Sequence, residues 1–189
     1  MAERPAVNAS PLIFLSRAGL LDMLTLEGSE IVVPETVAVE IRRRGNDDPA
    51  AQALEKTAWL KVIQATQIPD IIRAWDLGEG ESSVLAWGYA NAGTVVIVDD
   101  LAARRCAATL GIPVRGTLGL ILTAKKRGVI PQARPVLENL RQSGMYLSDR
   151  ILNQALNWLT SETRLKLLSA SSTADASGKQ LLTEHNGAV

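Results

Sequence analysis

The stretch that decides the fold is Thr94–Asp100, with the sequence TVVIVDD. Its first five residues are all β-branched, and two aspartates follow them directly. A near-continuous apolar run that ends at charged residues is typical of a strand buried on both faces, as in a parallel sheet covered by helices. The stretch therefore predicts such a sheet, with an acidic pair at the carboxyl end of one strand.

Four other short runs are predicted as strands of the same sheet, at 5–7, 31–33, 60–63 and 112–114, with 60–63 at an edge. Helical patterns lie between and after them, and they begin at Ser10 (as the cap of a helix reaching Leu24), at 34, 48 and 78, after 100, and at 117, 131 and 148. Strands that alternate with helices are typical of βαβ units. The predicted fold class is α/β, an open parallel sheet flanked by helices in three layers, with additional C-terminal helices.

The length of 189 residues suits one ordinary domain with an extension. Residues 1–150 are predicted to form the domain and 151–168 a C-terminal helix packed on it. Residues 169–189 are rich in Ser, Thr, Ala and Gly with scattered charge, so we expect them to form a flexible tail.

The composition excludes several function classes. Lys plus Arg and Asp plus Glu each number 20, and this balance disfavours a protein that merely coats DNA. A single Cys and a single His (His185) exclude a disulfide framework and disfavour zinc sites, Ser-His-Asp triads and Cys-His dyads. A hydrolytic site in this chain must therefore use carboxylates, amides, hydroxyls and Lys or Arg.

We expect a cytoplasmic protein. The apolar stretch Pro11–Leu15 is interrupted by Ser16 and Arg17, so it is too short for a signal sequence or a membrane span. The lone Cys106 is consistent with a reducing compartment.

Two glutamates are predicted to lie on helix faces that otherwise carry apolar residues. Glu40 follows Val37 by three residues, and Glu81 stands four residues after Leu77 and three before Val84. A buried carboxylate without a partner costs several kcal/mol, so such a group is normally paired or bound to a metal. A helix-edge position, or an ion pair with a nearby arginine, is the alternative for each.

Polar side chains also follow two predicted strands. Asp99 and Asp100 follow one strand, Asn8 and Ser10 follow another, and ligands of open α/β sheets bind beyond the carboxyl ends of strands. The acidic pair either caps the next helix through Asp100 or forms a cation site. A role as helix cap explains Ser10, whereas Asn8 has no comparable structural reason.

These groups are predicted to converge at one sheet edge as a metal site made of Asn8, Ser10, Glu40, Glu81, Asp99 and Asp100. Ligation by oxygen alone suits Mg²⁺ or Mn²⁺ rather than zinc. Such a site supports metal-assisted hydrolysis of phosphodiesters, which needs neither His nor Cys.

The order of the segments Val7–Ile13, Val33–Glu40, Gly78–Ala90 and Val98–Val114 resembles a PIN domain over roughly residues 5 to 150. It is similar to the VapC-like nucleases of prokaryotic toxin–antitoxin pairs. The segment Gly116–Ile130 resembles a PIN-like subfamily of unassigned function.

The resemblance implies a parallel sheet wrapped by helices, an acidic Mg²⁺ or Mn²⁺ site and cleavage of single-stranded RNA. It also implies a small antitoxin partner and a homodimer. By position in the family's motifs, the functional residues are Glu40, Glu81 (Glu79 as the alternative), Asp100 (Asp99 as the alternative) and Ser10.

Asn8 departs from the pattern, because PIN nucleases usually carry Asp at this place. Its carbonyl oxygen can bind a metal, but without a charge the affinity should fall. The leading hypothesis is a Mg²⁺- or Mn²⁺-dependent ribonuclease toxin, and Asn8 favours the alternative, a PIN-like module that binds RNA or a partner protein without cleavage. A nucleotide-binding α/β domain is disfavoured, since Gly78–Glu81 lacks a phosphate-loop pattern.

Short basic runs occur at Arg42–Arg44, Arg104–Arg105 and Lys125–Arg127. In the last two, Arg104, Arg105 and Lys125 are predicted to follow an RNA backbone. The alternative is that these runs are solvated helix ends. Trp75 is the aromatic residue we expect to be able to stack on a base.

Overall fold

The computed structural model describes residues 4–64 and 66–158. The chain divides into two compact units, Met1–Tyr146 and Leu147–Val189, and the sheet lies in the first. In the second unit, residues 149–158 are helical. Residues 159–168 of the predicted C-terminal helix and the whole predicted tail lie outside the described residues, so the domain boundaries stay a prediction.

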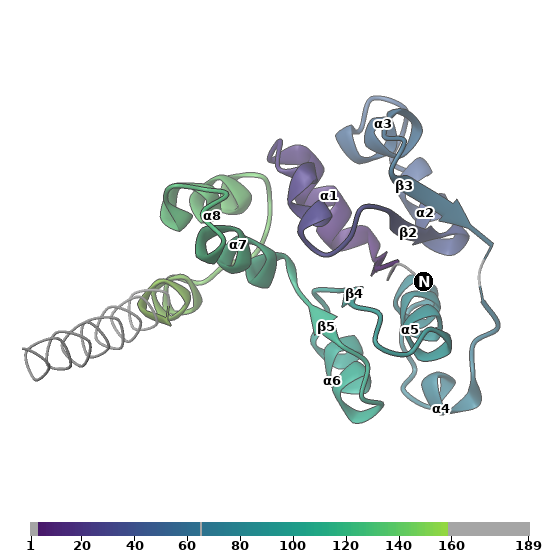
Figure 1. Cartoon of the computed structure of the whole chain (residues 1–189). Coiled ribbons are helices and arrows are strands. Elements are labelled where there is room, and N and C mark those ends of the chain that lie inside the picture. The colour runs from purple at the N-terminus through teal and green to yellow at the C-terminus, as the bar shows by residue number, and fades with distance from the viewer. Residues whose placement is uncertain (1–3, 65, 159–189) are drawn as a thin grey trace, which may run out of the picture. The chain divides into compact units, whose positions relative to one another are not determined.

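The first unit contains a five-stranded sheet in which every neighbouring pair is parallel, in the order β3-β2-β1-β4-β5. The strands are β1 (Ala6–Val7), β2 (Ile31–Pro34), β3 (Leu60–Ile63), β4 (Val96–Ile97) and β5 (Val114–Arg115) (Figure 1). The predicted α/β class with a parallel sheet between helices is confirmed, and 60–63 is an edge strand as expected.

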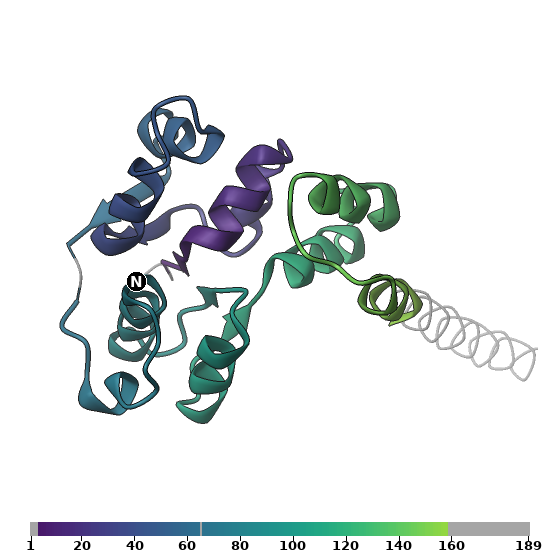
Figure 2. The ribbon, with the colours of Figure 1, turned by 180° about the vertical axis from the view of Figure 1, so that it is seen from behind.

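The helices of this unit are α1 (Ala9–Arg17), the 3₁₀ helix η1 (Leu21–Leu26), α2 (Glu35–Arg42), α3 (Pro49–Lys56), α4 (Asp70–Arg73), α5 (Glu79–Ala90), α6 (Leu101–Thr109), α7 (Thr117–Lys126) and α8 (Ala133–Gln142). The view from behind, in Figure 2, shows the same helices around the sheet. Helix α5 packs against β1, β2 and β4, and α2 packs against β2 and β3. None of the helices in the described ranges combines the length and the apolar character needed to cross a bilayer.

The strand order reverses direction at β1. The chain runs from β1 to β2 and β3 on one side and then returns to place β4 on the other side of β1. Val7 pairs with Ile97, and the Asn8 N–H donates to the Ile97 carbonyl at 2.9 Å. In open α/β sheets the crevice beyond the strand ends at such a reversal is where ligands bind. Asn8 and Asp99 follow the two strands that flank it.

Several elements differ from the predictions. The first helix begins at Ala9, two residues after β1 ends at Val7, so Asn8 and not Ser10 is the N-cap residue. Asn8 is the last residue with extended backbone, with φ of −85° and ψ of 167°, and the helix begins directly after it. This helix also ends at Arg17 and not near Leu24, because Gly19 takes a left-handed conformation with φ of 68°. Helix α4 was not predicted, since four residues are too few to show a helical period.

Gly88 of α5 marks a close approach between helix and sheet. A Cβ atom at this position would lie 2.6 Å from Val96 Cγ1 and 2.7 Å from Ile112 Cγ2. Real Cβ atoms do not approach carbon this closely, so any larger residue must displace α5 or these two side chains.

Gly88→Ala is expected to lower the free energy of unfolding by about 1–3 kcal/mol, because it overpacks the contact between α5 and β4. Helix propensity alone predicts the opposite sign, a gain of about 1 kcal/mol. Urea unfolding of the two proteins separates the effects. A variant with a higher free energy of unfolding would contradict this prediction, because it would show that Val96 and Ile112 move aside without destabilising the protein.

Asp48 is the N-cap residue of α3, as the sequence predicts. Its Oδ1 accepts a hydrogen bond from the Ala50 N–H at 2.9 Å, and its Oδ2 accepts bonds from Arg17 and Arg44 at 3.1 and 3.0 Å. Burial alone would raise the pKa of this carboxyl, but the Ala50 hydrogen bond and the two arginines outweigh burial and hold the pKa below its ordinary value.

Because its folded-state pKa is lowered, Asp48 stabilises the protein above its ordinary pKa of about 4 and loses this contribution as the pH falls through the lowered value. Asp48→Asn should lower the free energy of unfolding by about 1 kcal/mol at pH 7, since both arginine partners are partly exposed and screened. Urea unfolding from pH 7 to pH 2.5 measures this difference, which should shrink with acid. Asp47→Asn is the matched control, and a difference independent of pH would contradict the assignment.

Candidate functional site

Three side chains from separate elements meet beyond the carboxyl end of β1. Asn8 follows β1 and is 2 % exposed, Glu40 lies in the last turn of α2, and Glu81 lies in the first turn of α5. The Asn8 Nδ2 donates a hydrogen bond to Glu81 Oε1 at 2.8 Å across 73 residues of sequence. The structure therefore brings together the predicted amide and both predicted glutamates.

Gly80 makes this approach possible. A Cβ atom on Gly80 would lie 2.9 Å from Asn8 Oδ1 and 3.5 Å from Glu40 Oε2, and it would also touch Val37. The side chain of Glu81 folds back over Gly78, where an added Cβ would collide with Glu81 Oε2. Two glycines thus leave the space in which the oxygens of Asn8, Glu40 and Glu81 gather.

Neither glutamate is driven into the apolar core. Glu40 is exposed and Glu81 is half-buried, which corrects the prediction that both lie on buried faces. The helical spacing is as predicted, but α2 ends at Arg42 and Glu40 is therefore at the rim of the packed region. Glu81 is in the first turn of α5, where its side chain reaches Asn8.

The electrostatics of this cluster favour a cation. Partial burial and the neighbouring charge of Glu81 raise the pKa of Glu40, and Arg44 opposes them. Solvent screening limits the size of this effect, because Glu40 is exposed overall. The Asn8 Oδ1 is buried and accepts no hydrogen bond from any described residue, which leaves a costly unsatisfied acceptor.

The two aspartates after β4 have structural partners. Asp100 Oδ1 accepts a hydrogen bond from the Ala103 N–H at 2.8 Å and caps α6. Asp99 accepts bonds from the Thr117 N–H at 2.8 Å and from Thr117 Oγ1 at 2.6 Å, which tie the end of β4 to the start of α7. The sequence left two roles open for this acidic pair, a helix cap through Asp100 or a cation site. The structure shows the helix cap.

Within residues 4–64 and 66–158, no group of three or more acidic, His or Cys side chains is arranged to hold a metal. Asp99 and Asp100 are each bound at a helix start, and Glu40 and Glu81 face Asn8. Mg²⁺ usually keeps several waters and is held by only one or two carboxylates. The oxygens of Asn8, Glu40 and Glu81 therefore fit a hydrated Mg²⁺ or Mn²⁺ better than a site with four acids.

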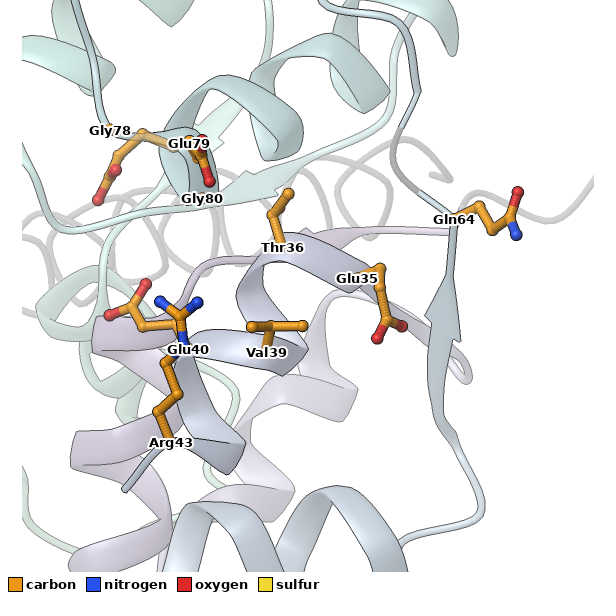
Figure 3. Close-up of a pocket in the computed structure, with 10 residues that line it drawn as sticks. Glu35, Thr36, Val39, Glu40, Arg43, Gln64, Gly78, Glu79 and Gly80 are labelled. Atoms are coloured by element: carbon orange, nitrogen blue, oxygen red, sulfur yellow. The ribbon is translucent and has the colours of Figure 1, made fainter. Parts of the chain in front are cut away.

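A pocket of about 660 Å³ opens beside Glu40 and Glu81. One side of it is formed by Glu35, Thr36, Val39 and Glu40 of α2 and by Arg43 directly after this helix, and the rest is Gln64 and the turn Gly78–Glu81. Figure 3 shows the side chains of Glu40 and Arg43 extending from α2 on the same side. This volume is in the range of small-molecule and cofactor sites.

The basic residues predicted to contact RNA lie elsewhere. Lys125 Nζ donates to the Pro131 carbonyl at 2.8 Å, the Arg104 guanidinium lies beside Gly116, and Arg105 is exposed on α6. None of these three is among the residues that line the pocket beside Glu40. Arg43 is not distinguished in the sequence from the arginines on either side, and only the fold shows that it lines this pocket.

Comparison with known families agrees with this architecture. Residues 5–161 match DUF3368, a family described as a PIN domain. No curated protein matches the chain. PIN domains are commonly nucleases, often of RNA, and generally use divalent metal ions. The match covers most of the 189 residues, and the parallel sheet between helices is the fold that the family implies, so this chain belongs to the PIN domain family.

Proposed function

We propose that the protein is an endoribonuclease that cleaves single-stranded RNA with the help of Mg²⁺ or Mn²⁺. One observation carries the proposal: the unsatisfied Asn8 Oδ1 lies with the carboxylates of Glu40 and Glu81 at the edge of an open pocket. Membership of the PIN family supports nuclease activity in general.

In this proposal Glu40, Glu81 and Asn8 Oδ1 hold the ion. When bound, the ion would polarise a phosphoryl oxygen and lower the pKa of a coordinated water. The Asn8 amide fixes the orientation of the Glu81 carboxylate through the 2.8 Å hydrogen bond. Ser10, half-buried in the first turn of α1, is proposed to orient a ligand or water.

Asp99 and Asp100 remain proposed contributors from the neighbouring strand. Asp100 uses only Oδ1 for its helix cap, which leaves Oδ2 outside that bond. Asp99 uses both oxygens for Thr117, so we assign it chiefly to fixing the end of β4.

The direct test is incubation of the protein with end-labelled single-stranded RNA in Mn²⁺, in Mg²⁺ and in EDTA. We expect internal cleavage that needs the divalent ion and is blocked by the chelator. Cleavage that persists at full rate in EDTA would contradict the proposed metal site. RNA left intact under all conditions would contradict the nuclease itself.

A second candidate function is a PIN-like module that binds RNA or a partner protein without cleavage. The observation that favours it is the Asn8–Glu81 hydrogen bond, because an amide satisfies Glu81 at a place where the family usually has an acid. Retention of RNA in a binding assay, together with no cleavage in Mn²⁺, supports this alternative.

The biological setting is proposed from the resemblance to VapC-like nucleases alone. It comprises a cytoplasmic toxin, a small antitoxin partner and a homodimer. We expect induced expression to arrest growth and a short reading frame directly upstream to relieve the arrest. Light scattering measures the oligomeric state, and a monomer that does not affect growth would contradict this setting.

A further inference from the structure

We propose that Arg43 forms a phosphate-binding subsite for single-stranded RNA in the pocket beside Glu40. In this subsite the guanidinium binds the phosphodiester next to the one that would contact the ion proposed at Glu40 and Glu81. The inference rests on the proposed function, which supplies the RNA, and it names the group that positions the chain.

The three consecutive arginines 42–44 differ in their side-chain partners. Arg42 pairs with Glu35 at 3.0 Å, and Arg44 pairs with Asp48 at 3.0 Å. The guanidinium of Arg43, between them, makes no ion pair or hydrogen bond with any residue in the described ranges, and only its backbone N–H is bonded, to the Val39 carbonyl. A guanidinium without a carboxylate partner has all five donors free for an anion.

The Arg43 side chain lies close to the proposed metal site. Arg43 follows Glu40 by three residues, so both side chains lie on the same face of the helix end. Both line the pocket, and Figure 3 shows them side by side below the turn Gly78–Gly80. An anion bound by Arg43 is therefore next to the carboxylates proposed to hold the metal.

The charges that line the pocket are mostly negative. The pocket is lined by four glutamates, Glu35, Glu40, Glu79 and Glu81, and Arg43 is the cation among its lining residues. A polyanion entering this surface is repelled everywhere except at Arg43 and at a bound metal ion. The planar guanidinium also matches two phosphate oxygens at once, which a lysine does not.

An apolar side chain lies between the charged groups. Val39, one turn before Arg43, is 36 % exposed and lines the same pocket. An exposed valine beside an arginine suits a nucleoside linked to a phosphate better than a free inorganic anion.

The test measures binding of a fluorescent single-stranded RNA in Mn²⁺ by anisotropy, with Glu81→Gln in every protein to prevent cleavage. Arg43→Gln should weaken binding about tenfold and reduce the salt dependence by roughly 0.7 in the slope of log K against log salt. Arg43→Lys should retain part of the affinity. Arg42→Gln is the matched control, because Arg42 is already paired, and it should change binding less than about twofold.

Two further measurements separate this inference from the proposed function. Arg43→Gln with Glu81 intact should bind Mn²⁺ as the wild type does, and circular dichroism should show an unchanged fold. Cleavage by the wild type, with equal RNA affinity of the Arg43→Gln and Arg42→Gln proteins, overturns the subsite and leaves the nuclease standing. No cleavage by the wild type, with binding that depends on Arg43, overturns the nuclease and supports the subsite.

Discussion

Replacing Glu81 by glutamine is expected to reduce RNA cleavage at least about 100-fold and to weaken Mn²⁺ binding. Groups that only support a metal ligand already cost about 10–100-fold when mutated, so loss of a ligand charge should cost no less. Glutamine keeps the side-chain length and an Oε1 that accepts the bond from Asn8. The fold should therefore remain, and single-turnover cleavage with a Mn²⁺ titration measures the effect.

Glu79→Gln is the matched control for this experiment. Glu79 stands two residues before Glu81, lines the same pocket and is exposed. Glu79 lies outside the contact between Asn8 and Glu81, so the Glu79→Gln protein should cleave RNA at a rate within about twofold of the wild-type rate. If instead the Glu79→Gln protein lost cleavage activity and the Glu81→Gln protein kept it, Glu79 and not Glu81 would be the metal-binding glutamate of α5.

Asn8→Asp should raise the affinity for Mn²⁺ about tenfold or more and increase cleavage. The substitution places a third carboxylate beside Glu40 and Glu81, in the position where Asn8 Oδ1 now lies buried without a partner. It also removes the hydrogen bond to Glu81 and adds like-charge repulsion. The metal-free protein should therefore lose about 1–3 kcal/mol of unfolding free energy, and Mn²⁺ should restore it.

Urea unfolding with and without Mn²⁺ measures both halves of this prediction. Asn8→Ala serves as the control, because it removes the same hydrogen bond without adding a charge. It should destabilise the protein in a way that Mn²⁺ does not reverse. An Asn8→Asp protein that neither binds Mn²⁺ more tightly nor becomes more stable with it would show that the three side chains do not form a cation site.

Local sequence predicts the parts of this fold that depend on local physics. The β-branched run 94–98 contains β4, and 31–33 lies within β2, because side-chain shape and a covered sheet decide such runs. Asp48 and Asp100 are N-cap residues, since a cap needs only an acceptor a few residues before an N–H. Two local predictions failed, the cap at Ser10 and the helix to Leu24. The helix already begins at Ala9, directly after the extended residue Asn8, and it ends at Arg17 before Gly19, whose φ is 68°.

The candidate site is predictable only in part, and the reason is sequence distance. The spacing along two helices selected Glu40 and Glu81, and the place after β1 selected Asn8. The bond between Asn8 and Glu81 spans 73 residues, and the one between Asp99 and Thr117 spans 18. No local pattern encodes the pairing of Asp99 with Thr117 at the start of α7.

By itself, the sequence determined the parallel sheet between helices, a composition almost without His and Cys, and the helical spacing that singles out Glu40 and Glu81. Only the tertiary structure decided which oxygens meet, because the reversal of strand order at β1 sets Asn8 against Glu81. Arg42 and Arg44 pair with the nearby carboxylates of Glu35 and Asp48, whereas the surroundings of Arg43 depend on the tertiary structure. The pocket that Arg43 lines is formed by the α2 segment together with Gln64 and the turn Gly78–Glu81, which are distant from it in sequence.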